Sequence, residues 1–319
     1  MKPYKPSNKV TNAGFTWLTV TALIGGLAIG GVTALVSRLF YLIVLFPLLM
    51  GAGGGFLQAY AVNRGKVRNP MIAGAFAILT GFVIYGTLNI GYYVAFRQEV
   101  AKELKQSTGE SDDTKINKII DENVLQIETG STGFLGFLKF SAQQGVGITR
   151  GSSKIELKNE WAWGYWAIEL AVISGITAFM AFAAAKEPFC ENSDEWYLPM
   201  ESVGSVPNEE SENFLSLIKN ENFVKAGALV DPQKQSPVPN LVVHLQRSPG
   251  DRLNDLVLTA SRTSLDNKGN VSSKEVIKGM ISPSQYAQLE QAVNANKLQS
   301  ADVPEALSEA VSEPNDNLG

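Results

Sequence analysis

Four long apolar segments dominate the first 185 residues of the chain, and they constrain its fold more than any other feature. They cover residues 15–36, 39–62, 70–96 and 161–185. About 20 apolar residues in helical conformation cross the ~30 Å of hydrocarbon in a bilayer, and each segment reaches that length. Because only helices and closed barrels satisfy the backbone inside lipid, the sequence predicts an all-α bundle of four transmembrane helices.

Basic residues in the short flanking segments predict the orientation of these helices. Residues 1–14 carry three lysines and residues 63–69 carry three basic residues, with no acidic residue in either segment. The positive-inside rule places such segments in the cytoplasm. We therefore expect a multi-pass protein of a bacterial-type inner membrane, with both termini cytoplasmic and residues 97–160 on the outer side.

The residues after the fourth apolar segment are polar and acidic. Residues 186–319 hold 11 basic and 20 acidic residues, whereas residues 1–185 hold 16 basic and 11 acidic ones. An acidic domain argues against nucleic acid as a partner, because phosphate binding needs a basic surface. Alternating apolar residues and capping signals predict a small cytoplasmic α+β domain over 186–298. Residues 299–319 have five acidic and no basic residues, and we expect a disordered tail there.

Particular elements are expected within the two polar regions. In the acidic domain these are a helix at 208–223, strands at 241–247, 255–265 and 271–279, and a helix at 282–297. In the outer region they are helices at 97–106 and 113–128, an apolar interfacial or re-entrant segment at 132–140 and a short strand at 154–157.

Small residues recur every four positions in the first two apolar segments. Gly26 and Gly30 share one face of the first, and Gly51 and Gly55 share one face of the second. Small residues let helix backbones approach closely in lipid. We expect these faces to pack inside the tight hairpin of the first two helices, and the alternative is a seam between copies of the chain in a homo-oligomer.

Glu169 stands inside the fourth apolar segment, about 12 Å from its outer end. Asn89 lies at a similar depth in the third segment, on the helix face that also carries Tyr85 and Tyr92. A carboxyl group in lipid is costly and usually faces a partner or a cavity. We expect Glu169 and Asn89 to hydrogen-bond across the two helices, as a packing contact, a step in an ion path or part of a ligand site.

No catalytic constellation is recognisable, so neither an enzyme nor a cofactor is predicted. His244 is the single histidine, and no nucleophile motif accompanies it. Cys190, the single cysteine, is expected as a juxtamembrane thiol. Residues 190–193 and 248–251 have the spacing of two zinc knuckles, but Ser193 stands where the first needs cysteine and the second has no cysteine, so no metal site is predicted.

These patterns favour a non-enzymatic membrane protein that serves interaction, assembly or regulation. Its expected partners are the lipid bilayer and another membrane or cytoplasmic protein. The alternative is a small-solute or ion transporter that uses Glu169. A single intramembrane acid and the lack of a convincing internal repeat favour the first interpretation.

Overall fold

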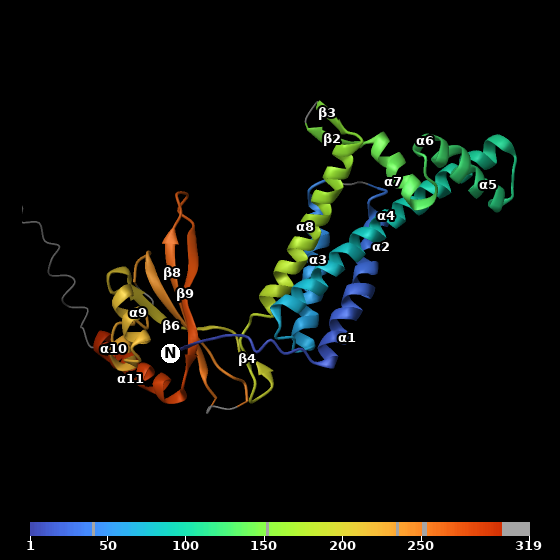
Figure 1. The fold of residues 1–319 in the computed structure, drawn as a ribbon. Coiled ribbons are helices and arrows are strands. Elements are labelled where there is room, and N and C mark those ends of the chain that lie inside the picture. Colours follow the sequence, from blue (N-terminus) through green and yellow to red (C-terminus); the bar gives the residue numbers. More distant parts are fainter. Residues whose placement is uncertain (40–41, 151–152, 234–235, 251–253, 302–319) are drawn as a thin grey trace, which may run out of the picture. The chain divides into compact units, whose positions relative to one another are not determined.

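The chain forms two compact units, which are described separately. The helical unit comprises Ser7–Lys186, and the sheet unit comprises Met1–Pro6 together with Glu187–Gly319. Most of the expected acidic tail, from residue 302 onward, lies outside the described residues. The computed structural model describes residues 1–39, 42–150, 153–233, 236–250 and 254–301 (Figure 1).

Four helices in the described part of the helical unit are long and apolar enough to cross a membrane, which confirms the hydropathy prediction. The first runs from Asn12 to Val36 as α1 (Asn12–Val20), a π-helical turn (Thr21–Gly25) and α2 (Gly26–Val36). The hydroxyl oxygen of Thr11 accepts a hydrogen bond of 2.9 Å from the backbone N–H of Gly14. This cap satisfies one of the N–H groups that the first turn leaves unpaired.

The other three long helices are α3 (Leu45–Arg64), α4 (Pro70–Thr108) and α8 (Glu160–Ala184). α3 begins at Leu45 rather than at residue 39. Its Pro47 therefore lies in the first turn, where the missing N–H removes no intrahelical hydrogen bond. α4 has 39 residues and continues past residue 96 into the polar sequence that follows. At about 1.5 Å per residue, α4 is longer than the hydrocarbon thickness of a bilayer.

The region between the apolar part of α4 and α8, which the sequence predicts on the outer side, folds as a small helical layer that we call the outer layer. Three buried isoleucine and leucine side chains, Ile116, Ile120 and Leu125, pack against Phe96 and Leu104 of α4. The expected strand at 154–157 is present and pairs with a preceding strand. The elements of this region are α5 (Asp113–Ile119), a π-helical segment (Ile120–Gln126), α6 (Ile127–Thr129), α7 (Gly133–Gln144), β2 (Val146–Arg150) and β3 (Ser153–Leu157).

The glycine faces pack within the bundle, but not against each other. A Cβ added at Gly30 would lie 2.7 Å from Cβ of Thr87, and one added at Gly26 would lie 2.8 Å from Cγ1 of Val83, both on α4. A Cβ added at Gly51 would lie 3.0 Å from Cβ of Ile176 on α8. Gly55 also faces a side chain of α8, that of Met180. The short connection keeps α2 and α3 adjacent in sequence, whereas close backbone approach is to α4 and α8.

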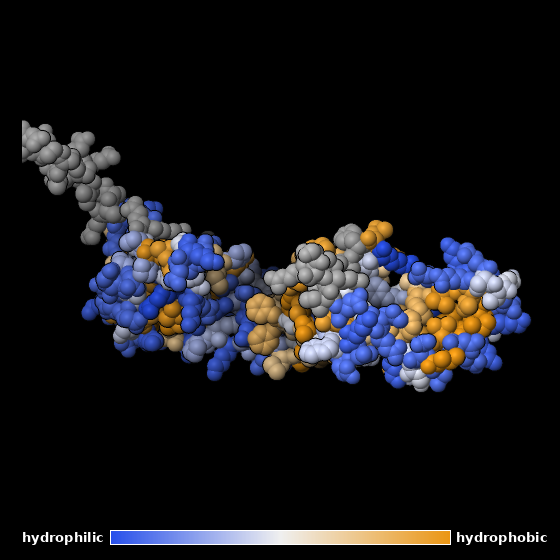
Figure 2. Space-filling view, turned by 90° about the horizontal axis from the view of Figure 1, so that it is seen from above, coloured by the Kyte–Doolittle hydropathy of each residue, from blue (hydrophilic) through white to orange (hydrophobic). Residues whose placement is uncertain are grey.

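The two units differ in the chemistry of their surfaces. Figure 2 shows mainly hydrophilic residues over the sheet unit, whereas hydrophobic residues reach the surface of the helical unit and have a hydrophilic rim. Large apolar side chains of the long helices are exposed, among them Ile24 at 66%, Phe56 at 67% and Phe179 at 73%. Exposure of this kind on several long helices is expected for surfaces that face lipid rather than water.

The sheet unit contains a five-stranded antiparallel sheet. The strands predicted at 241–247, 255–265 and 271–279 are present as β7 (Asn240–Gln246), β8 (Leu256–Leu265) and β9 (Val271–Ile281). Two further strands join the edges, β6 (Glu201–Pro207) beside β7 and β1 (Lys2–Pro3) beside β9. The N-terminal residues therefore complete the sheet of a domain whose other strands come from the last third of the chain.

Helices cover one face of this sheet, and a short hairpin packs on the other. α9 (Ser211–Lys219), α10 (Phe223–Gly227) and α11 (Pro283–Ala301) lie together beside the sheet in Figure 1. Phe214, Phe223 and Leu289 from these helices are buried against Leu258 of β8. Val257, one residue earlier, packs instead on the opposite face, as the two-residue period of a strand requires. The hairpin there consists of β4 (Phe189–Cys190) and β5 (Glu195–Trp196).

Capping chemistry fixes the start of α11 as the sequence predicts. The backbone N–H of Gln285 donates to the hydroxyl oxygen of Ser282 at 3.2 Å, and the backbone N–H of Ser282 donates to Oε1 of Gln285 at 2.8 Å. This reciprocal pair is a capping box. The helix expected at 208–223 is shorter, because a 3₁₀ turn (Asn208–Glu210) precedes α9 and a turn separates α9 from α10.

Candidate functional site

Glu169 lies on α8 and is only 6% exposed. Both of its carboxyl oxygens accept hydrogen bonds from tyrosine hydroxyls: Oε2 from Tyr85 at 3.0 Å, and Oε1 from Tyr165. Tyr165 precedes Glu169 by four residues, so the two side chains are neighbours on one helix face. Tyr85 comes from α4. A buried carboxyl group is costly unless it is hydrogen-bonded, and the two tyrosines supply those bonds.

The hydroxyl of Tyr165 also ties this site to a third segment. It lies 3.3 Å from the backbone carbonyl oxygen of Ile43, just before α3 begins. The carboxyl group of Glu169 is therefore surrounded by groups from α4, from α8 and from the connection into α3. These contacts from three elements leave the side chains of Glu169 and Tyr165 little freedom to change conformation.

Asn89 belongs to the same site, but its hydrogen bond differs from the expected one. Its side-chain N–H donates to the backbone carbonyl oxygen of Tyr85 at 2.9 Å, one turn earlier on α4. The hydrogen bond from α4 to Glu169 comes from the Tyr85 hydroxyl. The expected link between the third and fourth helices therefore exists, with tyrosine as the donor, because the longer Tyr85 side chain reaches across the interface.

Glu169 lines a cavity of about 330 Å³. Side chains from α4, α8 and α7 and the residue after α2 form its walls. This volume is at the lower end of the range for small-molecule sites. Its polar groups are Ser37, Asn89, Ser141 and Glu169 with the hydroxyls of Tyr85, Tyr92 and Tyr165, and its apolar side chains include Leu88, Phe137, Leu138 and Trp166.

A second hollow of about 310 Å³ adjoins this cavity. The two share Tyr85, Asn89, Leu138 and Trp166. The second hollow is lined almost entirely by apolar atoms, including those of Phe134 and Trp163. Both of these rings are partly exposed, at 37% and 42%. The site as a whole therefore has a chamber of mixed lining, termed the polar chamber because it contains Glu169 and the other polar groups, and an apolar chamber that opens to the surface of the bundle.

An ion pair in the outer layer helps to hold α7, which lines the cavity. Asp121 accepts a hydrogen bond from Nη1 of Arg97 at 3.1 Å and from the backbone N–H of Gly133 at 3.2 Å. Gly133 is the first residue of α7, so the carboxylate also lies at the positive end of that helix dipole. Arg97 donates in addition to Oδ1 of Asn117 at 2.8 Å. These contacts link α7 and the outer layer to α4.

Deeper in the bundle, two buried polar atoms have no hydrogen-bond partner among the described residues. They are Oγ of Ser174 and Oε1 of Gln58. The side-chain nitrogen of Gln58 donates to Thr80 at 2.7 Å and to the backbone carbonyl oxygen of Leu18 at 3.2 Å. Ser174 lies five residues after Glu169 on α8, or roughly 7.5 Å along the helix. Unused buried acceptors are unusual in a packed core.

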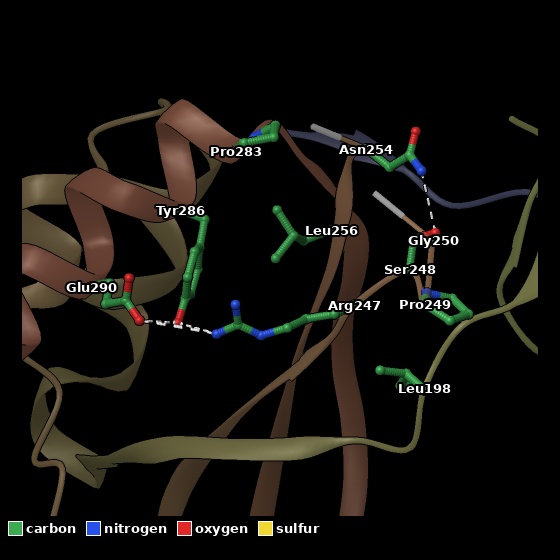
Figure 3. A pocket seen from close by; sticks show the side chains of 10 residues that line it. All are labelled: Leu198, Arg247, Ser248, Pro249, Gly250, Asn254, Leu256, Pro283, Tyr286 and Glu290. Carbon is green, nitrogen blue, oxygen red and sulfur yellow. Dashed lines mark hydrogen bonds and ion pairs between the residues drawn. The ribbon is translucent and has the colours of Figure 1, made fainter. Parts of the chain in front are cut away.

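The sheet unit has a larger cavity, of about 720 Å³, near the end of β7 (Figure 3). Arg247 lies over the ring of Tyr286, 4.9 Å from its centre, and donates to its hydroxyl at 2.8 Å. Figure 3 shows Glu290 pointing at the same two groups. Glu290 lies 3.9 Å from the guanidinium, and Glu201 lies 3.6 Å from it. Two carboxylates thus offset the charge of Arg247, which weakens any attraction for an anion.

Cys190 is buried in β4 of the sheet unit, where it packs with Tyr197 and Val257. The two knuckle-like segments do come together, since Oγ of Ser193 lies 3.0 Å from Oγ of Ser248. Burial raises the pKa of the Cys190 thiol, but hydrogen bonds with the side chains of Ser193 and Ser248 and with the backbone of Asn192 and Ser193 together outweigh burial, so the pKa lies below its usual value. Residue 251, the last knuckle position, lies outside the described residues.

Metal ligands do not gather elsewhere in the part of the chain that the structure describes. Among those residues, no group of three or more His, Cys, Asp or Glu side chains lies close enough to hold an ion. His244 lies on β7, paired with Thr259 of β8 and Ser202 of β6. Its neighbours in the sheet are therefore hydroxyl side chains.

The fold and the site define a protein with four helices long and apolar enough to span a membrane and a small antiparallel sheet domain. Comparisons of the chain with protein-family models, with curated proteins and with solved structures found no match. Its function must therefore be inferred from the chemistry of the site.

Sequence reasoning identified Glu169 and Asn89 and missed the two residues that hold the carboxyl group. The four-residue spacing of Tyr165 and Glu169 was a usable signal. Tyr85 could be placed on the face of Asn89, but its contact with Glu169 depends on the rotation of α4 against α8. No spacing within one helix determines that rotation.

Proposed function

We propose that this chain is a non-enzymatic, multi-pass membrane protein that acts by binding, in an interaction, assembly or regulatory role. The ligand or partner group would occupy the cavity at Glu169. The sheet unit would be the part of the protein that meets cytoplasmic partners. One observation carries this proposal: a buried carboxyl group, hydrogen-bonded by two tyrosine hydroxyls, lines a cavity of about 330 Å³.

The physical cost of this arrangement supports a role in binding. An ionisable residue inside an apolar helix destabilises insertion by roughly 2.5–3.5 kcal/mol on biological scales. A contact needed only for packing is met at lower cost by a serine or threonine, such as Thr177, whose hydroxyl lies 3.2 Å from the backbone carbonyl oxygen of Gly51. A carboxyl group that also borders an open chamber is suited to recognise a ligand.

Two features support a topology with both termini in the cytoplasm. The basic flanks at 1–14 and 63–69 follow the positive-inside rule. In addition, β1 near the N-terminus pairs with β9 of the sheet unit, so both must lie on one side of a membrane. Four crossings return the chain to its starting side. The outer layer over 97–160 and the cavity opening would then face the outer leaflet.

A photo-crosslinking experiment tests the binding role. A diazirine amino acid placed at Leu138, which borders both hollows, is expected to give a discrete adduct in native membranes. The same amino acid at Leu79, which is 45% exposed on α4, should give only diffuse lipid labelling. Glu169→Gln should abolish the adduct, and Glu160→Gln, on the same helix but exposed, should not. An adduct at Leu138 that does not depend on Glu169 would refute the proposal.

A second candidate function is transport of a small solute or ion through Glu169. The observation that favours it is the pair of unused acceptors on Ser174 and Gln58, deeper in the bundle than Glu169. Proton or cation uptake into liposomes that contain the full-length protein tests it. Uptake should fall in Glu169→Gln and in Gln58→Leu, and should be unchanged in Gln106→Leu, at an exposed position of α4. No uptake by the wild-type protein would argue against transport.

A further inference from the structure

We propose that the ligand of the Glu169 cavity is an amphiphilic organic cation, with an amine or quaternary ammonium head beside the carboxyl group and an apolar body in the adjoining hollow. This inference rests on the proposed binding function and specifies the chemistry of the ligand. The polar chamber and the apolar chamber form one continuous site, because they share four side chains.

The charge of the lining favours a cationic head. Among the described residues that line the two hollows, Glu169 is the only one that is Asp, Glu, Lys, Arg or His. An anion would meet repulsion in a low-dielectric site, where charge interactions are stronger than in water. The hydrogen bonds from Tyr85 and Tyr165 hold both carboxyl oxygens in place, so little conformational freedom remains to be lost when a donor arrives.

The aromatic walls add a second attraction for the same head group. The rings of Tyr85, Tyr92, Tyr165 and Trp166 all line the polar chamber. A cation within about 6 Å of an aromatic ring face gains roughly 0.5–2 kcal/mol, and more than one ring can contribute. Quaternary ammonium groups, which cannot donate hydrogen bonds, depend on such walls for recognition. The neutral polar groups of Ser37 and Asn89 can solvate the periphery of the head group.

The apolar chamber accepts the rest of the molecule. Phe134, Leu138, Trp163 and Leu170 line it, and its polar surface is small. Gly86 leaves this chamber open, because a Cβ added there would meet no atom within 4 Å. A hydrocarbon chain or ring system in this space would leave lipid or water for a surface of aromatic and aliphatic side chains. The partly exposed rings of Phe134 and Trp163 mark an entrance from the side of the bundle.

One ligand chemistry can come from two sources here. The cation can be a free amphiphilic amine, or it can be the ethanolamine or choline head of a membrane lipid. The Glu169 carboxyl group lies nine residues inside α8, about 13 Å from the helix start. A lipid head group that is drawn in from the interface and a free amphiphile that enters from the bilayer would both meet the side opening.

A binding experiment with the full-length protein tests the proposal. Dodecyltrimethylammonium is the probe, dodecanol and dodecyl sulfate are its neutral and anionic counterparts, and native mass spectrometry in maltoside micelles measures the bound fraction. The ammonium probe should bind saturably, and Glu169→Gln should weaken it by about tenfold or more. Glu160→Gln is the matched control and should leave binding unchanged. Gly86→Leu should weaken the ammonium probe and dodecanol alike, because it fills the apolar chamber.

The outcomes separate the ligand class from the binding function. If dodecanol binds as well as the ammonium probe and Glu169→Gln changes neither, the cationic assignment is wrong while the cavity remains a binding site. Tighter binding of dodecyl sulfate overturns the assignment as well. If Gly86→Leu also has no effect and no adduct forms at Leu138, the binding function fails too. Retained thermal stability of Glu169→Gln shows that its effect is not unfolding.

Nanodiscs distinguish the two sources of the cation. If an ammonium lipid occupies the site, the ammonium probe should bind several-fold more weakly in phosphatidylethanolamine nanodiscs than in phosphatidylglycerol nanodiscs, and Glu169→Gln should remove the difference. Equal affinity in both lipids, with dependence on Glu169 retained, indicates a free amphiphile. Equal affinity without dependence on Glu169 contradicts both forms of the proposal.

Discussion

Replacing Gly30 by alanine, beside the same replacement at Gly31, measures how closely the first long helix approaches α4. Gly30 and Gly31 are neighbours on α2, and each replacement adds the same methyl group. A Cβ at Gly30 would meet Thr87 at 2.7 Å and would also strike the backbone carbonyl oxygen of Ile84, whereas a Cβ at Gly31 would meet no atom within 4 Å. A difference between the two variants therefore reports the contact with α4 alone.

The magnitude follows from the size of the overlap. Carbon atoms in ordinary contact lie about 3.5–4.0 Å apart, so the new Cβ is roughly 1 Å too close to Thr87. A backbone carbonyl cannot move aside as a flexible side chain can, so the helices must separate. Overpacking of this kind costs about 1–3 kcal/mol. The gain in helix propensity, about 1 kcal/mol for glycine to alanine, applies to both variants and cancels in the comparison.

Thermal unfolding of the full-length protein in maltoside micelles, followed by size-exclusion fluorescence, gives the measurement. At about 2–4 °C per kcal/mol for a domain of this size, Gly30→Ala should unfold roughly 2–12 °C below Gly31→Ala. Equal unfolding temperatures would refute the close approach of α2 to α4. Loss of an oligomer peak in Gly30→Ala with the monomer's stability unchanged would assign this face to a contact between copies of the chain instead.

Three further predictions concern the sheet unit and the topology. Replacing Ser193 and Ser248 together by cysteine adds two thiols beside that of Cys190. The reduced double variant should therefore bind Co²⁺ and show thiolate-to-cobalt absorption, whereas the wild type should not. Equal spectra of the two proteins would contradict the close approach of residues 193 and 248. In a variant without Cys190, a cysteine introduced by Ser111→Cys should react with a membrane-impermeant maleimide in intact cells, and one introduced by Asn267→Cys should react only after lysis. The reverse pattern would overturn the proposed orientation. Burial, with the hydrogen bond to Glu290, raises the pKa of Tyr286 to about 12. Because this folded-state pKa exceeds the unfolded value of about 10, the free energy of unfolding should fall as pH rises from about 10 to about 12. Tyr286→Phe should remove that part of the fall, as measured by phenolate absorbance and by unfolding at each pH.

Only part of the candidate site could be predicted from the sequence. Glu169 and Asn89 could be identified because a polar group inside a long apolar segment is conspicuous at any position. Their hydrogen-bond partners could not, because these depend on how α4 and α8 rotate against each other. The same limit explains the glycine faces: spacing shows that Gly26 and Gly30 share a face, but not that the face meets α4 rather than α3.

In the sheet unit, the strands with a clear sequence signal could be predicted and the edge strands could not. β7 is close to an alternating pattern, and β8 and β9 flank the turn signal at residues 266–270. β6 contains Gly204 at a register shift against β7 and ends at Pro207, which breaks the pattern. β1 has only two residues, too few for any periodicity, and it is a strand because β9 offers it an unpaired edge.

By itself, the sequence determined the features that depend on neighbouring residues: four apolar helices, the capping box at Ser282, the positions of three strands and the presence of a carboxyl group in the fourth helix. Hydropathy, caps and strand periods are local, so they survive in any plausible packing. Tertiary structure alone decided which surfaces meet. It brought Tyr85 to Glu169, opened the hollow beside Gly86 and joined the N-terminal strand to β9. These contacts link residues far apart in the chain, and their positions follow from the close packing of whole helices and strands.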